Sequence, residues 1–232
     1  MSQQFLKLIQ RGATAEIADA VAADPSLLSW RDAQGVSAIL WSIYSGQPLV
    51  RDYLLAEKSR IGQLLDIFEA SAVGDALTLR QILNETPQAA HELSGDGWTP
   101  LHLAAAFGTP EAVRLLLQNG AQVDAVSQNP QANQPLHATL ALGRNPETIE
   151  LLLKAGANPN ARQTGGFTPI FSAAAANRRD LVELLIANGA DPAISNDFGQ
   201  TAAGFARERH HPDLADWLES LGSRDALSGD TA

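Results

Sequence analysis

Asp96–Ala121 (DGWTPLHLAAAFGTPEAVRLLLQNGA) decides the fold, because its residue types have structural roles at fixed positions. Thr99 can cap a helix by offering its hydroxyl to free backbone N–H groups. Pro100 suits the first helical position, where its missing N–H is not needed. Gly108 interrupts the helical pattern, and Gly120 ends a second apolar stretch. The segment therefore predicts a helix, a turn, a second helix and a loop.

The break between the two predicted helices recurs along the chain. It falls at Gly12, Gly46, Gly74, Gly108, Gly143, Asn177 and His210, in steps of 34, 28, 34, 35, 34 and 33 residues. A loop Gly-Ala pair recurs independently at Gly120, Gly156 and Gly189. Such a period is typical of a repeat architecture that grows by adding helix pairs.

The central stretch resembles the ankyrin repeat family, whose signature is Thr-Pro-Leu-His-x-Ala. Thr99-Pro100-Leu101-His102-Leu103-Ala104 matches this signature without a gap. By period the resemblance covers about 220 residues, strongly from Ser94 to Leu221 and loosely before Leu64. It implies an all-α solenoid of about seven helix-turn-helix units, with hairpin turns that project at about a right angle. It also implies that the hairpin tips and the first helix of each pair bind other proteins on a concave side.

The period divides the chain into seven units and a tail. We expect an atypical N-terminal capping repeat at 1–31, divergent repeats at 32–63 and 64–95, repeats at 96–127, 128–163 and 164–195, a C-terminal capping repeat at 196–221, and a disordered tail at 222–232. Terminal repeats differ from the rest because one of their faces meets water.

The short step of 28 residues predicts an irregular joint near 56–66. The turn that normally joins two units must be trimmed there, or absorbed into a helix from about Ile61 to Val73. A deviation from the repeat can mark a binding site, so the Lys58–Leu65 region is a candidate pocket for a small ligand or an enzyme site.

Composition and net charge limit the kinds of partner and site that the chain can have. The net charge of −10 repels phosphate backbones and anionic lipids, so we expect neither nucleic acid nor a membrane as partner. The chain has no cysteine, which excludes disulfides, thiolate metal sites and a cysteine nucleophile. The start, MSQQFLKLIQRGATAE, lacks the pattern of a secretory signal, and no apolar run is long enough for a membrane span. We therefore expect a cytoplasmic protein.

No catalytic pattern is present in the sequence, and we predict neither an enzyme nor a bound metal or cofactor. In the ankyrin family, the histidine of the signature bridges backbone groups of adjacent turns. The resemblance implies this structural role for His102 and His137. His210 and His211 lie at an interhelix break, where a surface turn is favoured over a metal site with Asp213.

The resemblance places six large apolar residues on the concave side. They are Tyr44, Trp98, Phe107, Leu142, Phe167 and Phe198. Exposed aromatic residues in a row are typical anchors of protein interfaces. The alternative is that each ring packs on the neighbouring hairpin and only stiffens the array.

Positive charge gathers near the C-terminal units, at Arg178, Arg179, Arg207 and Arg209. This gradient can orient a charged partner. It is equally compatible with an ordinary solvated surface.

The leading hypothesis is a monomeric, non-catalytic adaptor or regulator that holds a protein or peptide segment in its concave groove. Two alternatives remain: a small-ligand binder or enzyme that uses the irregular joint, and a homo-oligomeric structural protein whose apolar strip is buried between copies. The sequence identifies neither the partner nor whether binding inhibits, recruits or stabilises it.

Overall fold

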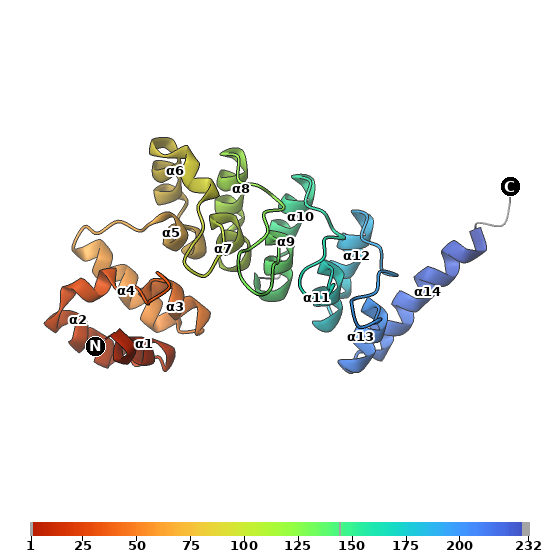
Figure 1. Ribbon diagram of the computed structural model, residues 1–232, viewed down its shortest axis with the longest axis horizontal. Coiled ribbons are helices and arrows are strands. Elements are labelled where there is room, and N and C mark those ends of the chain that lie inside the picture. Colours follow the sequence, from red (N-terminus) through yellow and green to blue (C-terminus); the bar gives the residue numbers. More distant parts are fainter. Residues whose placement is uncertain (1, 144, 229–232) are drawn as a thin grey trace. The chain divides into compact units, whose positions relative to one another are not determined.

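The computed structural model describes residues 2–143 and 145–228 (Figure 1). It divides into two compact units, Met1–Gln122 and Val123–Ala232. Both are built from helices arranged in successive pairs, and the only β-type pairing in the described residues is an isolated bridge between Arg31 and Ser37. The fold is therefore all-α, as the sequence predicts.

Unit 1 contains four successive helix pairs. They are α1 (Ser2–Gln10) with α2 (Thr14–Ala23), α3 (Ala38–Tyr44) with α4 (Pro48–Arg60), α5 (Ile67–Val73) with α6 (Ala76–Glu85), and α7 (Pro100–Phe107) with α8 (Pro110–Gln118). Short 3₁₀ helices, η1 (Pro25–Ser29) and η2 (Pro87–His91), follow α2 and α6.

Unit 2 contains three further pairs. They are α9 (Pro135–Ala138), continued by a π-helix η3 (Thr139–Gly143), with α10 (Pro146–Lys154); α11 (Pro169–Ala175) with α12 (Arg179–Ala187); and α13 (Ala202–Glu208) with α14 (Pro212–Ser228).

Side-chain caps explain where the first helix of several pairs begins. The Thr99 hydroxyl accepts a hydrogen bond from the backbone N–H of His102, and Ser37 and Thr201 cap α3 and α13 in the same way. Asp66 begins α5 with a capping box that Glu69 completes. These caps satisfy backbone donors that would otherwise lack a partner at the helix start.

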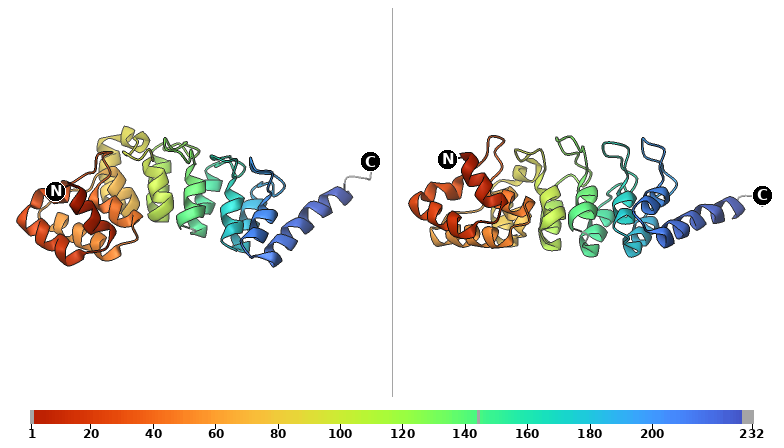
Figure 2. Two further views of the ribbon diagram at one scale, coloured as in Figure 1. Left: turned by 60° about the horizontal axis from the view of Figure 1, so that its bottom comes forward. Right: turned by 90° about the horizontal axis from the view of Figure 1, so that it is seen from below.

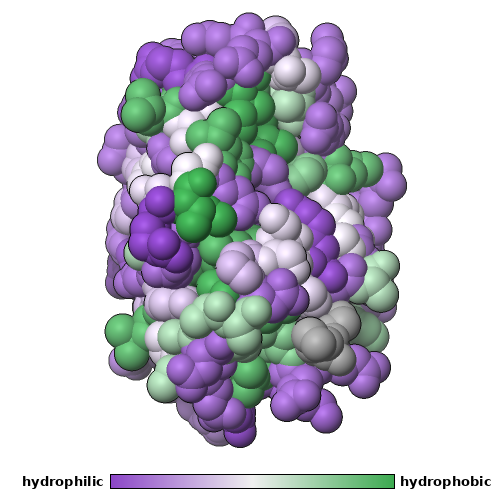
Figure 3. Space-filling view, turned by 90° about the vertical axis from the view of Figure 1, so that its left-hand side faces the viewer, coloured by the Kyte–Doolittle hydropathy of each residue, from purple (hydrophilic) through white to green (hydrophobic). Residues whose placement is uncertain are grey.

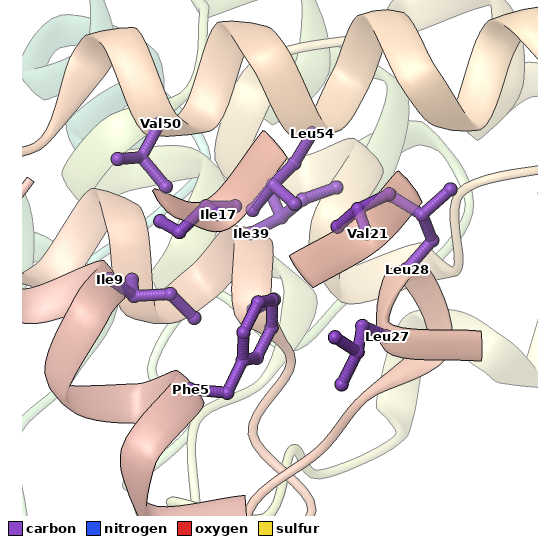
Figure 4. Close-up of a cluster of buried hydrophobic side chains, with 10 residues drawn as sticks. Phe5, Ile9, Ile17, Val21, Leu27, Leu28, Ile39, Val50 and Leu54 are labelled. Carbon is purple, nitrogen blue, oxygen red and sulfur yellow. The ribbon is translucent and has the colours of Figure 1, made fainter. Parts of the chain in front are cut away.

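Apolar side chains fill the space between helix pairs. The surface seen in Figure 3 is mainly hydrophilic, with apolar side chains in separate patches. Beneath it, side chains of the first two pairs and η1 point toward one another (Figure 4). This core consists of Phe5, Ile9, Ile17, Val21, Leu27, Leu28, Ala38, Ile39, Val50 and Leu54. The atypical first pair is therefore an integral part of unit 1.

Within each unit, loops project from one edge of the helix pairs (Figure 2). The tight turns share one pattern, in which a backbone N–H bonds the carbonyl four residues later: Asp32 to Val36, Ser94 to Trp98, Gln163 to Phe167 and Asn196 to Gln200. Neighbouring loops in unit 2 are joined by backbone bonds, from Thr164 to Gln131 at 2.9 Å and from Asp197 to Gly165 at 3.0 Å.

Five of the seven interhelix breaks use left-handed backbone, whereas Gly108 has a φ of −83°. Gly12, Gly46 and Gly74 have φ values of 73°, 64° and 74°, which glycine adopts without steric cost. Asn177 and His210 adopt the same conformation with φ values of 53° and 64°. At these five breaks the period read from the sequence thus corresponds to a recurring backbone conformation.

Of the two alternatives for the irregular joint, the structure shows the trimmed turn and not a helix that begins at Ile61. Helix α4 ends at Arg60 and α5 begins at Ile67, so residues 61–66 form a short connection without a projecting hairpin. Leu64, expected on an inner helix, is exposed in this connection. The capping box at Asp66 supplies the physical reason, because it starts the helix later than the apolar pattern suggests.

The C-terminal end also differs from expectation. Helix α14 continues to Ser228, across most of the segment 222–232 that we expected to be disordered. Residues 229–232 lie outside the described residues.

The missing hairpin brings two other turns of unit 1 into contact. A Cβ atom added to Gly95 would lie 1.6 Å from the backbone oxygen of Gln34, and no side chain can give way there. We predict that Gly95→Ala lowers the free energy of unfolding by roughly 2 kcal/mol or more. Gly204→Ala is the matched control. Gly204 lies in α13, and a Cβ atom added to it would lie 3.7 Å from its nearest neighbour.

The control should stabilise the chain slightly, since alanine favours a helix more than glycine does. Urea unfolding followed by circular dichroism measures both changes. Equal stability of Gly95→Ala and the natural chain would show that the two turns do not pack as described.

Candidate protein-binding surfaces

The six predicted binding residues lie on first helices and loops, but they differ in exposure. Leu142 and Phe198 are 54% and 71% exposed. The other four are half-buried. Tyr44, Trp98 and Phe107 belong to unit 1, and Leu142, Phe167 and Phe198 belong to unit 2. Each unit thus contains three of the six residues.

The three aromatic residues of unit 1 form one cluster. The ring centroids of Tyr44 and Phe107 are 5.7 Å apart, and those of Trp98 and Phe107 are 6.1 Å apart in a stacked arrangement. The rings pack on a buried core that includes Leu40 and Leu103. This packing is what the alternative interpretation expects, because each ring stabilises its neighbours.

Tyr44 carries a polar group into this cluster. Its hydroxyl oxygen is buried near the carboxylate of Asp96, a hairpin residue. Burial raises the pKa of the Tyr44 phenol above its ordinary value, and the negative charge of Asp96 raises it further. The phenol therefore stays protonated under physiological conditions, and Tyr44 is fixed as a neutral member of the cluster.

A second aromatic cluster lies in unit 2. Phe167 is central to it, with ring-centroid distances of 5.4 Å to Phe171, 5.6 Å to Phe205 and 6.2 Å to Phe198. Phe198 is the exposed member, whereas Phe171 is buried. Phe167 and Phe198, which were both predicted, thus lie in one cluster. This cluster also contains Phe171 and Phe205, which the prediction omits.

Phe205 and Phe171 were missed as members of this cluster. Each follows the threonine at the N-cap position of its helix, Thr168 or Thr201, by about one helical turn. This spacing alone could have placed both rings on the first helices beside Phe167.

Three histidines, His102, His137 and His211, have structural roles. The His102 Nδ1 atom lies 2.8 Å from the Thr99 hydroxyl, and the His137 Nε2 atom lies 3.2 Å from the backbone oxygen of Phe167 in the next turn. His211 makes a similar contact, 3.2 Å from the oxygen of Ala175. Among the described residues, no group of three potential ligands is arranged to hold a metal ion.

The irregular joint contains a buried ion pair that the sequence analysis did not identify. The Lys58 ammonium lies 2.7 Å from the Glu69 carboxylate, and the two side chains are only 5% and 1% exposed. The same Glu69 oxygen accepts the backbone N–H of Asp66 at 3.3 Å. The pair therefore links α4 to the capping box of α5 across the shortened connection.

Two cavities flank this joint. One, of about 480 Å³, is lined by Lys58, Leu64 and Leu65 among others, and the other, of about 460 Å³, includes Arg31 and Asp66. The charged groups named here already pair within the protein, Lys58 with Glu69 and Arg31 with Asp66.

A membrane span requires a helix that has both sufficient length and apolar character. None of the described helices meets both requirements.

Comparison with known proteins decides the family. A model of ankyrin repeats in three copies matches residues 67–163 and 136–225. The chain belongs to the ankyrin repeat family. Its fold is therefore an all-α ankyrin solenoid, and ankyrin repeats generally serve as protein interaction modules. The family match begins at the first residue of α5, after the irregular joint.

Individual ankyrin relatives are similar over part of their length. The serine/threonine-protein kinase VIK of Arabidopsis thaliana is 34% identical over 113 residues, which cover 49% of this chain and 25% of the kinase. B-cell lymphoma 3 protein homolog of Mus musculus is 39% identical over 79 residues, or 34% and 17% of the two chains. Ankyrin repeat, SAM and basic leucine zipper domain-containing protein 1 of Ornithorhynchus anatinus is 32% identical over 144 residues, or 61% and 29%. The matched segment spans less than a third of each of these relatives.

The ring contacts predict different stability effects at two aromatic positions. Phe107→Ala should lower the free energy of unfolding by about 2 kcal/mol, because it opens a space between two rings and the core. Phe198→Ala should change it by no more than about 0.5 kcal/mol, since that ring is largely in solvent. Urea unfolding of the two variants measures the contrast, and equal losses would contradict it.

The buried ion pair predicts a strong effect at the joint. Lys58→Met should destabilise the chain by about 3 kcal/mol, because it leaves the Glu69 carboxylate buried without its cation. The double variant Lys58→Met/Glu69→Gln should recover much of that loss, because no buried charge remains. Urea unfolding of the two single variants and the double variant gives the coupling between the side chains, and additive effects would rule out this interpretation.

Proposed function

We propose that this ankyrin protein is a non-catalytic adaptor or regulator that binds a segment of another protein. Its binding surface includes the hairpin tips and the first helices, with Tyr44, Trp98, Phe107, Leu142, Phe167 and Phe198 as contact residues. The observation that carries the proposal is the exposure of Leu142 and Phe198 in unit 2, where Phe198 contacts the aromatic cluster through Phe167. Large apolar side chains exposed beside a rigid apolar base are typical anchors of protein interfaces.

The two units contribute differently under this proposal. In unit 1, Tyr44, Trp98 and Phe107 are half-buried in a packed cluster, so they give a stiff surface. In unit 2, Leu142 and Phe198 extend into solvent and can be buried by a partner. Burying an apolar side chain of this size contributes about 1.5–3 kcal/mol, so a few such residues can dominate the affinity.

The proposal also covers the organisation and setting of the chain. We propose seven repeats with boundaries near 31, 63, 95, 127, 163 and 195, a cytoplasmic location, and a monomer that binds its partner without nucleic acid. The net charge of −10 supports the last point. The small-ligand alternative at the joint is weaker, because Lys58 and Arg31 are already engaged by carboxylates of the chain.

The test compares capture of protein partners from a lysate of the native cell by the natural chain and by Leu142→Ser/Phe198→Ser. We expect the double variant to lose at least tenfold of the captured partner, because two exposed anchors are removed. Quantitative mass spectrometry measures the loss.

The matched control is Leu49→Ser/Leu77→Ser, which removes two apolar side chains exposed by 73% and 80% on α4 and α6. This control should capture the partner as the natural chain does. Equal capture by all three proteins would contradict the proposed surface, and equal loss in both variants would indicate nonspecific apolar adhesion.

A further inference from the structure

The unit 2 aromatic cluster surrounds a cavity of about 370 Å³ between the first helices of successive repeats. Phe167, Phe171 and Phe205 line its apolar side, and Ala175 and Ala176 line the end of α11. The volume lies in the lower part of the range of about 300–1,000 Å³ that is usual for ligand pockets. The contact of His211 with the backbone oxygen of Ala175 holds in place the side of the cavity that Ala175 and Ala176 line.

Arg209 also lines this cavity and gives it a charge. Its guanidinium carbon lies 5.0 Å from the centre of the Phe205 ring, in a cation–π contact. Stacking on an aromatic face orients the planar guanidinium but leaves its N–H edges able to bind a carboxylate with two hydrogen bonds.

Four other arginines of unit 2 pair with carboxylates of the same chain. Arg162 pairs with Asp197, Arg178 with Asp180, Arg179 with Glu183, and Arg207 with Asp216 and Glu219. Within the part of the chain that the structure describes, no carboxylate pairs with Arg209. Of the four arginines that the sequence analysis named as the positive cluster, only Arg209, at the aromatic cavity, has no carboxylate partner among the described residues.

We propose that this cavity binds a large apolar side chain of a partner protein whose neighbouring residue is aspartate or glutamate. The apolar side chain enters between the phenylalanine rings, and the carboxylate pairs with Arg209. This inference rests on the proposed adaptor function and specifies the chemistry of the partner segment. The net charge of −10 opposes acidic partners at long range, but salt screens it beyond about 8 Å. The net charge of the chain therefore does not prevent a carboxylate from pairing with Arg209 once the two groups are in contact.

The closing experiment uses the full chain with labelled alanine methyl groups and a synthetic hexapeptide. The peptide has a phenylalanine followed by an aspartate between two glycine pairs, with both ends blocked. Methyl NMR spectra are recorded up to about 5 mM peptide, which detects dissociation constants near 1 mM. We expect saturable shifts of the Ala175 and Ala176 methyl signals, because both residues line the cavity.

Two control peptides separate the apolar contribution from the charge. Replacing aspartate by asparagine should raise the dissociation constant about threefold, which is the effect expected for an exposed ion pair. Replacing phenylalanine by alanine should abolish the shifts. Absence of shifts with the first peptide, or equal affinity for the aspartate and asparagine peptides, would overturn the inference.

Matched protein variants test the role of Arg209. Arg209→Gln should remove the preference for aspartate over asparagine, whereas Arg207→Gln should retain it because Arg207 already pairs with Asp216 and Glu219. A preference that survives Arg209→Gln would overturn the assignment of the carboxylate. If partner capture by the natural chain still depends on Leu142 and Phe198, the adaptor proposal stands even when the peptide result is negative.

Discussion

The structure depends on one constraint: a single ankyrin helix pair cannot bury its own apolar surface. Helix α7 shows this most clearly, because every residue from Pro100 to Ala106 is buried although the helix has only eight residues. Such a helix needs neighbours on several sides, and it packs against α5, α8 and η2 within unit 1. Stability is therefore shared between adjacent repeats, and the surfaces left over are the hairpin tips and helix edges.

A departure from the period has to be compensated locally under this constraint. The connection at 61–66 has no hairpin, so the chain loses the turn that would normally separate its neighbours. Two compensations are present in unit 1: the close approach of Gly95 to Gln34, and the buried link from Lys58 to Glu69. Both are rigid, because one is a backbone contact and the other is an ion pair that is costly to break. The joint is better explained as structural reinforcement than as a vacant binding site.

The sequence predicted the features that depend on local chemistry. Thr99 caps a helix as expected, the period marks the interhelix breaks, and His137 bridges to the next turn. The sequence left open whether the turn near Ile61–Val73 is trimmed or absorbed into a helix, and the structure shows a trimmed turn with a capping box and a buried ion pair at the helix start. The aromatic clusters were only partly predicted, because Phe167 and Phe205 are 38 positions apart in number but 5.6 Å apart in space. Periodicity assigns residues to a face and does not show which rings touch.

The sixth repeat shows how a departure from the signature can create a surface. In the fourth repeat, the His102 ring lies 2.8 Å from the Thr99 hydroxyl. In the sixth, Phe171 replaces the histidine, and the buried hydroxyl of Thr168 has no hydrogen-bond partner among the described residues. An unsatisfied buried hydroxyl costs about 1–3 kcal/mol. In return, the Phe171 ring packs against Phe167 and Phe205 and supplies the wall of the cavity beside Arg209. Because a local rule is broken where a pocket is formed, we interpret this substitution as functional rather than structural.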